Sequence, residues 1–367
     1  MQQQRLQSLD ALRGFDMLFI MGGSTLFIAL NQCFPTSFGT AFAEQMEHTK
    51  WSGFTFYDMV FPLFLFIAGI SFPFSLKSQI EKGIPRKSIY TNIIRRGLTL
   101  VLLGIIYNGA LQLDFGNIRF ASVLARIGLA WMIASLIFMN TKRISRGVIC
   151  VAILVGYWIL LAFVPSPEAN GADRFSMEGS IVGYIDRLIV PGRLHLTIHD
   201  PEGLASLFPA IVTALLGMFT GELIKSKSKN LTPYKKVGSL VIFGLALCII
   251  GQAWNVVFPI NKNLWTSSFT CYVGGLSMLL FAAFYLVIDV WEFRKWTLFF
   301  TVIGMNSITI YLAQEIINFQ GIANFFLGGI VKLIPENAAN LISCIGYIAV
   351  CWAFLYFLYK KKIFLKV

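Results

Sequence analysis

The stretch VGSLVIFGLALCIIGQAWNVV, residues 237–257, contains no charged side chain. As an α-helix rising 1.5 Å per residue, it is long enough to cross a hydrocarbon core of about 30 Å. Similar apolar runs recur along the 367 residues, of which 56% are hydrophobic and 13% charged, and the mean hydropathy is +0.70. A soluble domain carries about 25% charged residues. The sequence therefore predicts a protein whose solvent includes lipid.

These runs predict an all-α polytopic membrane protein with about ten transmembrane helices. We expect the helices near residues 13–34, 54–76, 97–112, 121–140, 147–164, 204–224, 237–257, 266–290, 297–314 and 338–359. A β-barrel is disfavoured, because barrel strands alternate between apolar and polar residues and these runs do not. We expect one transmembrane domain over residues 1–367. No cleavable signal peptide is expected, because the first run is long and contains Asp16.

The basic residues alternate by loop. They concentrate in residues 77–96, 142–146, 225–236, 294–295 and 360–366, with Arg5 and Arg13 near the start. The positive-inside rule then places both termini in the cytoplasm of a multi-pass protein of the plasma (inner) membrane. The topology accounts for the positive residues behind the net charge of +12, so this charge does not indicate nucleic-acid binding. The other Lys and Arg residues are expected on the outer side of the membrane or in its interior: Lys50, Arg119, Arg126, Arg174, Arg187, Arg193, Lys262 and Lys332.

Two loops on the predicted outer side are long, residues 35–53 and 165–203. The second mixes acidic, basic and histidine side chains, which suits a sugar or another polyhydroxyl ligand, although a solvated loop has the same composition. Segment 319–334 is apolar enough to lie in the interface or to re-enter the membrane. Of the six cysteines only Cys33 lies near the outer surface, so neither a disulfide framework nor a metal site is expected.

Charged groups at the ends of the spans are candidates for function, because a charge inside a bilayer needs a partner or a task. In SLDALRG, Asp10 and Arg13 share a helix face. They either pair locally or line an opening for the nucleotide or pantetheine part of a cofactor. His48, one of three histidines, precedes the second span and suits proton transfer near neutral pH. Asp58, ten residues on, either orients this ring or holds a substrate amine.

Two further polar motifs stand at span ends. Asp200 and Glu202 in HDPEG either start a helix or recognise an ammonium group or sugar hydroxyls. Asn306 and Ser307 in GMNS either bridge helices or line a tunnel for an acyl carrier, and Arg126 near the outer end of the fourth span belongs with them. No phosphate loop, dinucleotide fingerprint, HExxH or nucleophile elbow occurs, which disfavours ATP-driven transport and soluble-type hydrolase chemistry.

Six motifs, spread in a fixed order over nearly the whole chain, resemble those of the heparan-α-glucosaminide N-acetyltransferase family. They are SLDALRG, HTKWSGFTFYDMVFPLFLFIAG, VLARIG, HDPEG, NKNLW and GMNSITIYL. The resemblance implies a transmembrane acyltransferase that takes acetyl-CoA from the cytosol and acetylates the amine of a glucosamine-type sugar on the outer side. It also implies a homodimer, no metal, and a minimal prokaryotic form without the lumenal domain of lysosomal relatives.

Residue by residue, the resemblance implies catalysis by His48 with Asp58. It implies substrate contacts at Trp51, Asp200, Glu202 and Ser24, and cofactor contacts at Asp10, Arg13, Arg126, Asn306 and Ser307. Some relatives have a first-helix Asn where an ungapped alignment places Ser24, so Ser24, Asn31 or backbone groups would take its role here.

The expected chemistry must join a cytosolic donor to an outer acceptor. Cytoplasmic Lys and Arg would hold the phosphates of acetyl-CoA while its pantetheine arm reaches through the helix bundle. His48 then acts either as general base in a ternary complex or as an acetylated intermediate. The alternative function is an amino-sugar or oligosaccharide transporter without acyl chemistry.

Overall fold

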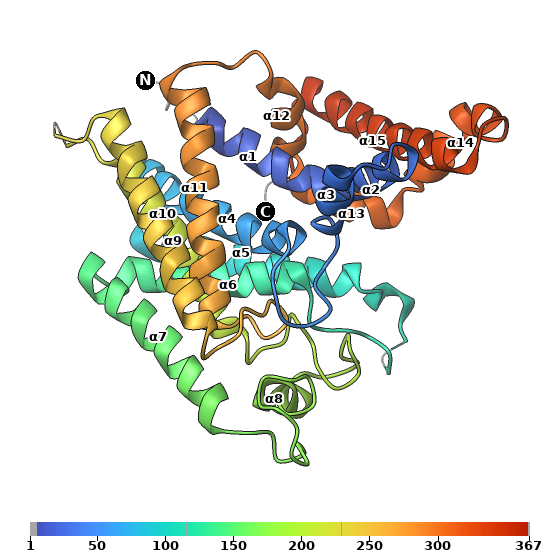
Figure 1. The fold of residues 1–367 in the computed structure, drawn as a ribbon. Helices are drawn as coiled ribbons and strands as arrows, with labels where there is room; N and C mark the ends of the chain where they lie inside the picture. The colour runs from blue at the N-terminus through green and yellow to red at the C-terminus, as the bar shows by residue number, and fades with distance from the viewer. Residues whose placement is uncertain (1–5, 115, 229, 366–367) are drawn as a thin grey trace. The chain divides into compact units, whose positions relative to one another are not determined.

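The computed structural model describes residues 6–114, 116–228 and 230–365 (Figure 1). These residues form helices joined by turns and loops. Extended pairing within them is confined to two isolated bridges, Arg119 with Gly192 and Pro165 with Ser180. The predicted all-α class is confirmed. Arg5, Lys229 and Lys366, which the charge analysis placed on the basic side, lie outside the described residues.

By length and apolar composition, nine helices of the described chain qualify as membrane spans, and a bent pair brings the number to ten. This confirms a polytopic protein with about ten spans. The side on which the termini lie stays a prediction. The spans are α1 with α2 (Gln7–Leu18, Ser24–Cys33), α4 (Phe56–Glu81), α5 (Arg86–Tyr107), α6 (Val123–Asn140), α7 (Arg143–Phe163), α9 (Leu207–Lys225), α10 (Pro233–Asn255), α11 (Ser267–Tyr285) with its π-helical end (Leu286–Val290), α15 (Glu336–Lys360), and the bent pair α12 (Thr297–Met305) with α13 (Ser307–Ile316).

Several helices begin where local chemistry favours a start. The side chain of Ser122 accepts a hydrogen bond from the Ala125 amide at the start of α6, and Thr232 does the same for Lys235 at the start of α10. Helix α5 begins at Arg86, after Pro85, well before the predicted residue 97. Hydropathy missed this first part of α5 because the segment is polar.

The described chain divides into two compact units. The terminal unit comprises residues 6–49, 55–60 and 283–365, and the central unit comprises residues 50–54 and 61–282.

In the terminal unit, α1 packs closely on α12. A Cβ atom added to Gly14 would lie 1.7 Å from the backbone oxygen of Phe300, and one added to Gly304 would lie 2.0 Å from that of Asp10. Only glycine permits this approach of two backbones. After α1 the chain passes through a π-helical turn, Phe19–Gly23, in which Gly22 has φ +105°. The predicted first span is thus one run with a break.

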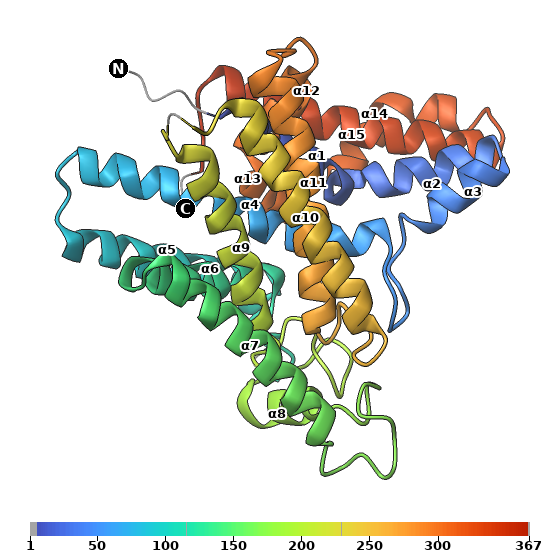
Figure 2. The same ribbon diagram turned by 60° about the vertical axis from the view of Figure 1, so that its left-hand side comes forward.

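The rest of the terminal unit holds two shorter helices. Helix α3 (Ser37–Glu44) lies within the predicted 35–53 loop. Helix α14 (Phe319–Val331) runs beside α15 (Figure 2) and has 13 residues, too few to span a bilayer. The interfacial or re-entrant placement of segment 319–334 stays a prediction.

The central unit is built on the packing of α5 against α6 and of α6 against α9 (Figure 2). The predicted 165–203 loop contains one helix, α8 (Ile181–Ile189). Beneath this loop lies an apolar cluster that includes Tyr157, Leu161, Val182 and Phe258. This cluster anchors the loop, because Val182 belongs to both.

Candidate active site

His48 lies in the terminal unit beside a buried carboxylate. Its Nδ1 atom is 2.8 Å from Oδ1 of Asp58. The Asp58 side chain is only 1% exposed, whereas the His48 side chain is 49% exposed. The two residues that the sequence proposed as a pair are therefore in contact, with the imidazole accessible and the carboxylate enclosed.

Local hydrogen bonds hold Asp58 in one orientation. Its Oδ2 atom accepts bonds from the Thr49 hydroxyl (3.1 Å) and from the amide and hydroxyl of Thr55 (3.2 and 3.1 Å). The Thr55 hydroxyl also reaches the Glu47 backbone oxygen at 2.6 Å. Asp58 stands in the first turn of α4, where the helix dipole favours a negative charge. Oδ1 is thereby left for His48.

This arrangement fixes what the histidine can do chemically. A carboxylate only accepts hydrogen bonds, so Nδ1 of His48 is the donor and carries a proton. In the neutral ring Nε2 then has a lone pair that can take up a proton. The ring of Tyr57, with its centroid 4.5 Å from that of His48, limits how the imidazole can turn. The pair has the geometry of an oriented general base.

Asp10 and Arg13 lie on one face of α1, with Oδ1 of Asp10 3.8 Å from Nη1 of Arg13. Asp10 is buried, and the Arg13 side chain is 23% exposed. The local ion pair that the spacing predicted is therefore present. Cofactor binding by these residues stays a prediction.

Asn306 and Ser307 lie at the 68° bend between α12 and α13. Asn306 is 2% exposed, and its Oδ1 atom accepts a bond from the Thr309 hydroxyl at 3.3 Å. Its Nδ2 atom has no acceptor among the described residues. A buried amide donor without a partner is costly, so this bend suits a ligand with an acceptor oxygen.

Ser24 lies just after the π-helical turn and is buried. Its hydroxyl donates to the backbone oxygen of Phe19 at 3.3 Å. The side-chain amide of Asn31, the alternative to Ser24, donates to the Thr40 hydroxyl at 3.4 Å. Both side chains thus have protein partners, and substrate contact by Ser24 stays a prediction.

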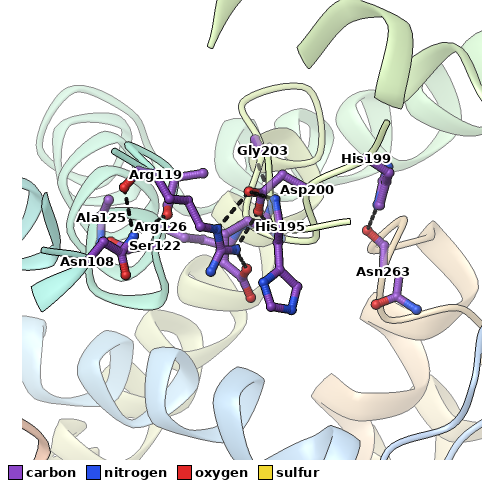
Figure 3. A network of polar contacts seen from close by, with 12 residues as sticks. Asn108, Arg119, Ser122, Ala125, Arg126, His195, His199, Asp200, Gly203 and Asn263 are labelled. Carbon is purple, nitrogen blue, oxygen red and sulfur yellow. Dashed lines mark hydrogen bonds and ion pairs between the residues drawn. The ribbon is translucent and has the colours of Figure 1, made fainter. Parts of the chain in front are cut away.

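In the central unit, Asp200 and Glu202 both form ion pairs with Arg119. Figure 3 shows Asp200 beside Arg119. Nε and Nη2 of Arg119 donate to the two oxygens of Asp200 at 2.8 and 2.6 Å, and Nη2 also donates to Glu202. The backbone amides of His195 and Glu202 donate to the same carboxylate, each at 2.9 Å. Asp200 is fully buried and receives four hydrogen bonds from protein groups, and substrate contact by Asp200 stays a prediction.

The pKa shifts of Arg119 and Asp200 favour an ion pair in which both side chains stay charged. Burial alone would raise the pKa of Asp200, but the hydrogen bonds and charge of Arg119 outweigh it and hold the pKa below its ordinary value. Burial likewise disfavours the charged form of Arg119, yet the two carboxylates raise its pKa. Asn108 steadies the segment by donating to the backbone oxygens of Arg119 and Ala121, both at 2.8 Å.

Arg126 lies in α6, 1% exposed. Its Nη2 atom donates to the backbone oxygen of Gly203 at 2.9 Å and to the Ser206 hydroxyl, and its guanidinium stands 4.9 Å from the ring centre of Trp265. Nε and Nη1 have no acceptor among the described residues. Arg126 thus joins α6 to the HDPEG segment, and its predicted cofactor contact remains untested.

Trp51 packs edge-on against His199, with ring centroids 5.3 Å apart, and its indole N–H donates to the backbone oxygen of Phe175 at 2.7 Å. His199 is fully buried, and burial lowers its pKa to about 4. Its Nε2 atom is 2.9 Å from the backbone oxygen of Asn263 (Figure 3). The half-buried indole is thus rigidly held, as a sugar-stacking ring must be.

Sequence reasoning missed Arg119, Thr49 and Thr55. Arg119 was only one of several basic residues off the basic loops, and nothing in its local pattern pointed to Asp200, which lies 81 residues away. The two threonines flank the segment KWSGF before the second span, but only the fold shows that both donate hydrogen bonds to Asp58.

The chain matches the model of the heparan-alpha-glucosaminide N-acetyltransferase catalytic family over residues 5–254. It is 27% identical to human heparan-alpha-glucosaminide N-acetyltransferase over 417 aligned positions, which cover 99% of this chain and 60% of the human protein. The mouse protein of the same name is also 27% identical, over 88% of this chain and 56% of its own length. The chain thus spans about 60% of the length of the curated relatives it matches. The motifs, the all-α membrane fold and the family match together show that this chain belongs to the heparan-alpha-glucosaminide N-acetyltransferase catalytic family.

Proposed function

We propose that this protein is a transmembrane N-acetyltransferase that moves an acetyl group from cytosolic acetyl-CoA to the amine of a hexosamine on the outer side of the membrane. The contact between the accessible His48 and the buried Asp58 carries the proposal. Family membership supports the reaction class, because the relatives are named for N-acetyl transfer to a glucosaminide.

His48 would act on the acceptor amine. As the sugar nitrogen bonds to the acyl carbon, it becomes positively charged and passes a proton to Nε2 of His48. The C–S bond breaks, and the proton on His48 passes to the departing thiolate, which leaves as a thiol. Asp58 would stabilise the imidazolium formed in between, because its carboxylate accepts a hydrogen bond from the Nδ1–H group throughout and stays negatively charged.

Acetyl-CoA would supply the activated acyl group. The residues at the bend of α12 and α13 fit such a ligand. The buried Nδ2 of Asn306 has no acceptor among the residues that the structure describes, and the carbonyl oxygen of a thioester or pantetheine amide could be that acceptor. Asn306 and Ser307 would hold this part, and Arg13 with Asp10 would hold the more polar part. The predicted contact by Arg126 belongs to the same proposal.

The acceptor sugar would be recognised in the central unit. Trp51 would offer an aromatic face. Glu202, whose Oε2 atom accepts from Arg119, would offer its other carboxylate oxygen to an ammonium or hydroxyl group. Asp200 contributes by fixing Arg119 and the backbone of His195 and Glu202. These roles, the plasma (inner) membrane location and the homodimer are parts of the proposal.

An acetyl-transfer assay with the purified full-length protein tests the proposal. Amino sugars, including free glucosamine and glycan ends that carry glucosamine, are offered with radiolabelled acetyl-CoA. We expect acetylation of at least one acceptor and loss of more than about 99% of it in His48→Ala, since a missing general base costs about 100-fold or more. Failure of the wild type to bind CoA in calorimetry at micromolar levels, together with no transfer to any acceptor, would overturn it.

The two chemical routes are separated by a trapping experiment. Incubation with labelled acetyl-CoA without acceptor leaves label on the protein if His48 becomes acetylated, and this label is absent in His48→Ala. Direct transfer in a ternary complex leaves no label although full activity is present. The geometry of His48 is compatible with both routes.

The broken span formed by α12 and α13 favours one further candidate, an amino-sugar transporter, because transporters place discontinuous helices at their substrate sites. Vesicles distinguish the two functions. A transporter accumulates unmodified labelled glucosamine without acetyl-CoA, whereas the proposed enzyme yields only N-acetylated product and requires acetyl-CoA.

A further inference from the structure

An apolar groove of about 500 Å³ lies in the central unit between α7 and α10, above α9 and α11. Leu216 and Phe219 of α9 line its floor, and Phe243 and Ile250 of α10 line one side. Phe243 and Ile250 are 56% and 48% exposed. The four helices are all candidate spans, so we expect the open side of the groove to face hydrocarbon.

A cation stands at one end of this groove. Arg143, the first residue of α7, lines it and is exposed. Lys142 is the N-cap of α7, and within the described chain its side chain makes no cap hydrogen bond to the amides of the first turn. Within the described chain, the side chains of Arg143 and Lys142 make no hydrogen bond or ion pair.

The neighbouring basic side chains at this end already have partners within the protein. Arg146 lies 3.0 Å from Glu222 and stacks on Phe138 at 3.9 Å. The ammonium of Lys225 donates to the backbone oxygen of Pro73 at 2.8 Å, and that of Lys236 to Ile224 at 2.6 Å. Arg143 lines the groove and Lys142 directly precedes it in the chain, and both exposed side chains can therefore offer a positive charge to a ligand at this end.

We propose that this groove binds one anionic phospholipid. An acyl chain lies along the apolar floor, and the phosphate meets Arg143, Lys142 and the amides of the first turn of α7. The hydrocarbon of a bilayer consists of acyl chains, so an acyl chain is the expected occupant of an apolar groove that opens toward it. Basic residues at the end of a groove between transmembrane helices recognise an anionic headgroup. A helix N-terminus adds donors and a favourable dipole for phosphate.

Two variants on one helix test the acyl-chain site. Gly147 lines the groove, and a Cβ atom added there meets no atom within 4 Å, so Gly147→Leu fills the groove without displacing backbone. Gly156, also on α7, has equally open surroundings and does not line the groove. Gly156→Leu is therefore a matched control for the change in size and helix propensity. Arg143→Gln tests the headgroup site.

Binding is measured by native mass spectrometry on the full-length detergent-purified proteins titrated with phosphatidylglycerol or phosphatidylcholine. We expect the wild type and Gly156→Leu to retain one phosphatidylglycerol, and Gly147→Leu to bind it about tenfold more weakly. Arg143→Gln is expected to lose about fivefold in affinity for phosphatidylglycerol and little for phosphatidylcholine.

Equal retention by Gly147→Leu and Gly156→Leu would overturn the proposal, as would equal affinity of the wild type for both lipids. A shift from dimer to monomer in Gly147→Leu, with lipid retention unchanged, would also overturn it and would assign the groove to a second copy of this chain. Coincident thermal midpoints of the two leucine variants show that any difference in binding is not one of folding.

Discussion

At the scale of single residues, the contact between His48 and Asp58 depends on which groups surround the carboxylate. Oδ2 of Asp58 is held by Thr49 and Thr55, which leaves Oδ1 for the imidazole. The ten-residue spacing of the pair in the sequence raised the possibility of contact, but it did not reveal the threonines. Their hydroxyl groups serve Asp58 only because the loop before α4 folds back on itself.

Asp58→Asn should lower kcat for acetyl transfer by about 100-fold or more while leaving KM within about threefold. The amide removes the negative charge that stabilises the imidazolium and permits the wrong tautomer of His48. Steady-state kinetics with the best acceptor measures this effect. Glu47→Gln is the matched control, because it removes a neighbouring carboxylate whose side chain is exposed, and it should retain wild-type kcat. Equal activity of Asp58→Asn and Glu47→Gln would contradict the assigned role.

Asp186 and His199 should give the stability of the central unit two opposed pH dependences. Burial raises the pKa of Asp186 to about 6 and lowers that of His199 to about 4, against about 3.9 and 6.5 in an unfolded chain. Between pH 4 and 6 the folded state keeps a proton on Asp186 that the unfolded state loses, so this term falls as pH rises. For His199 the unfolded state holds the extra proton, so that term rises with pH.

Asp186→Asn should therefore make the apparent thermal midpoint rise more steeply between about pH 4.5 and 6 than in the wild type. His199→Gln should make the midpoint fall across the same range. Each term is worth about 2 kcal/mol. Unfolding followed by intrinsic fluorescence measures the profiles. Profiles of the three proteins that run parallel would show that these groups titrate normally.

At the scale of elements, hydropathy predicted the spans but not their breaks. Residues 297–314 appear as one run because Gly304 to Ser307 are too few to change an average over twenty residues. The 68° bend at Asn306 follows α12, which packs on α1, a contact between segments far apart in the sequence. The π-helical turn within the first span was equally hidden, although Gly22 is the residue that its φ of +105° requires.

Gly14→Ala should destabilise the packing of α1 on α12. The added Cβ would meet the backbone oxygen of Phe300 at 1.7 Å, so the helices must separate, at a cost of about 1–3 kcal/mol. Gly328→Ala on α14, where a Cβ meets nothing within 4 Å, is the control. Thermal unfolding in detergent should show a lower midpoint for Gly14→Ala alone. Coincident midpoints would mean that this close approach is not required.

At the scale of the whole molecule, composition was sufficient to predict the all-α membrane class, because a 13% charged chain cannot cover a soluble surface. The candidate site was less accessible from sequence. Single motifs located His48, Asp200 and Glu202, but the ion pairs with Arg119 join segments about 80 residues apart. Such pairings depend on the fold and leave no local pattern.

The predicted topology places both termini and the basic loops in the cytoplasm, and cysteine labelling tests it. In a background with the native cysteines changed to serine, Lys87→Cys and Lys227→Cys should react with an impermeant maleimide only from the cytoplasmic side, and Asn170→Cys only from the outside. All three positions are exposed. Labelling of Asn170→Cys and Lys87→Cys from the same side would contradict the topology.

The central claim is that acetyl transfer crosses the membrane and depends on His48. Its most direct measurement uses sealed vesicles that contain the purified protein, with labelled acetyl-CoA on the side of the basic loops and the amino sugar on the other. We predict that N-acetylated sugar appears in the acceptor compartment with wild type and Glu47→Gln, and falls by about 100-fold or more with His48→Ala. Equal product with His48→Ala, or product only when donor and acceptor share one compartment, would contradict the claim.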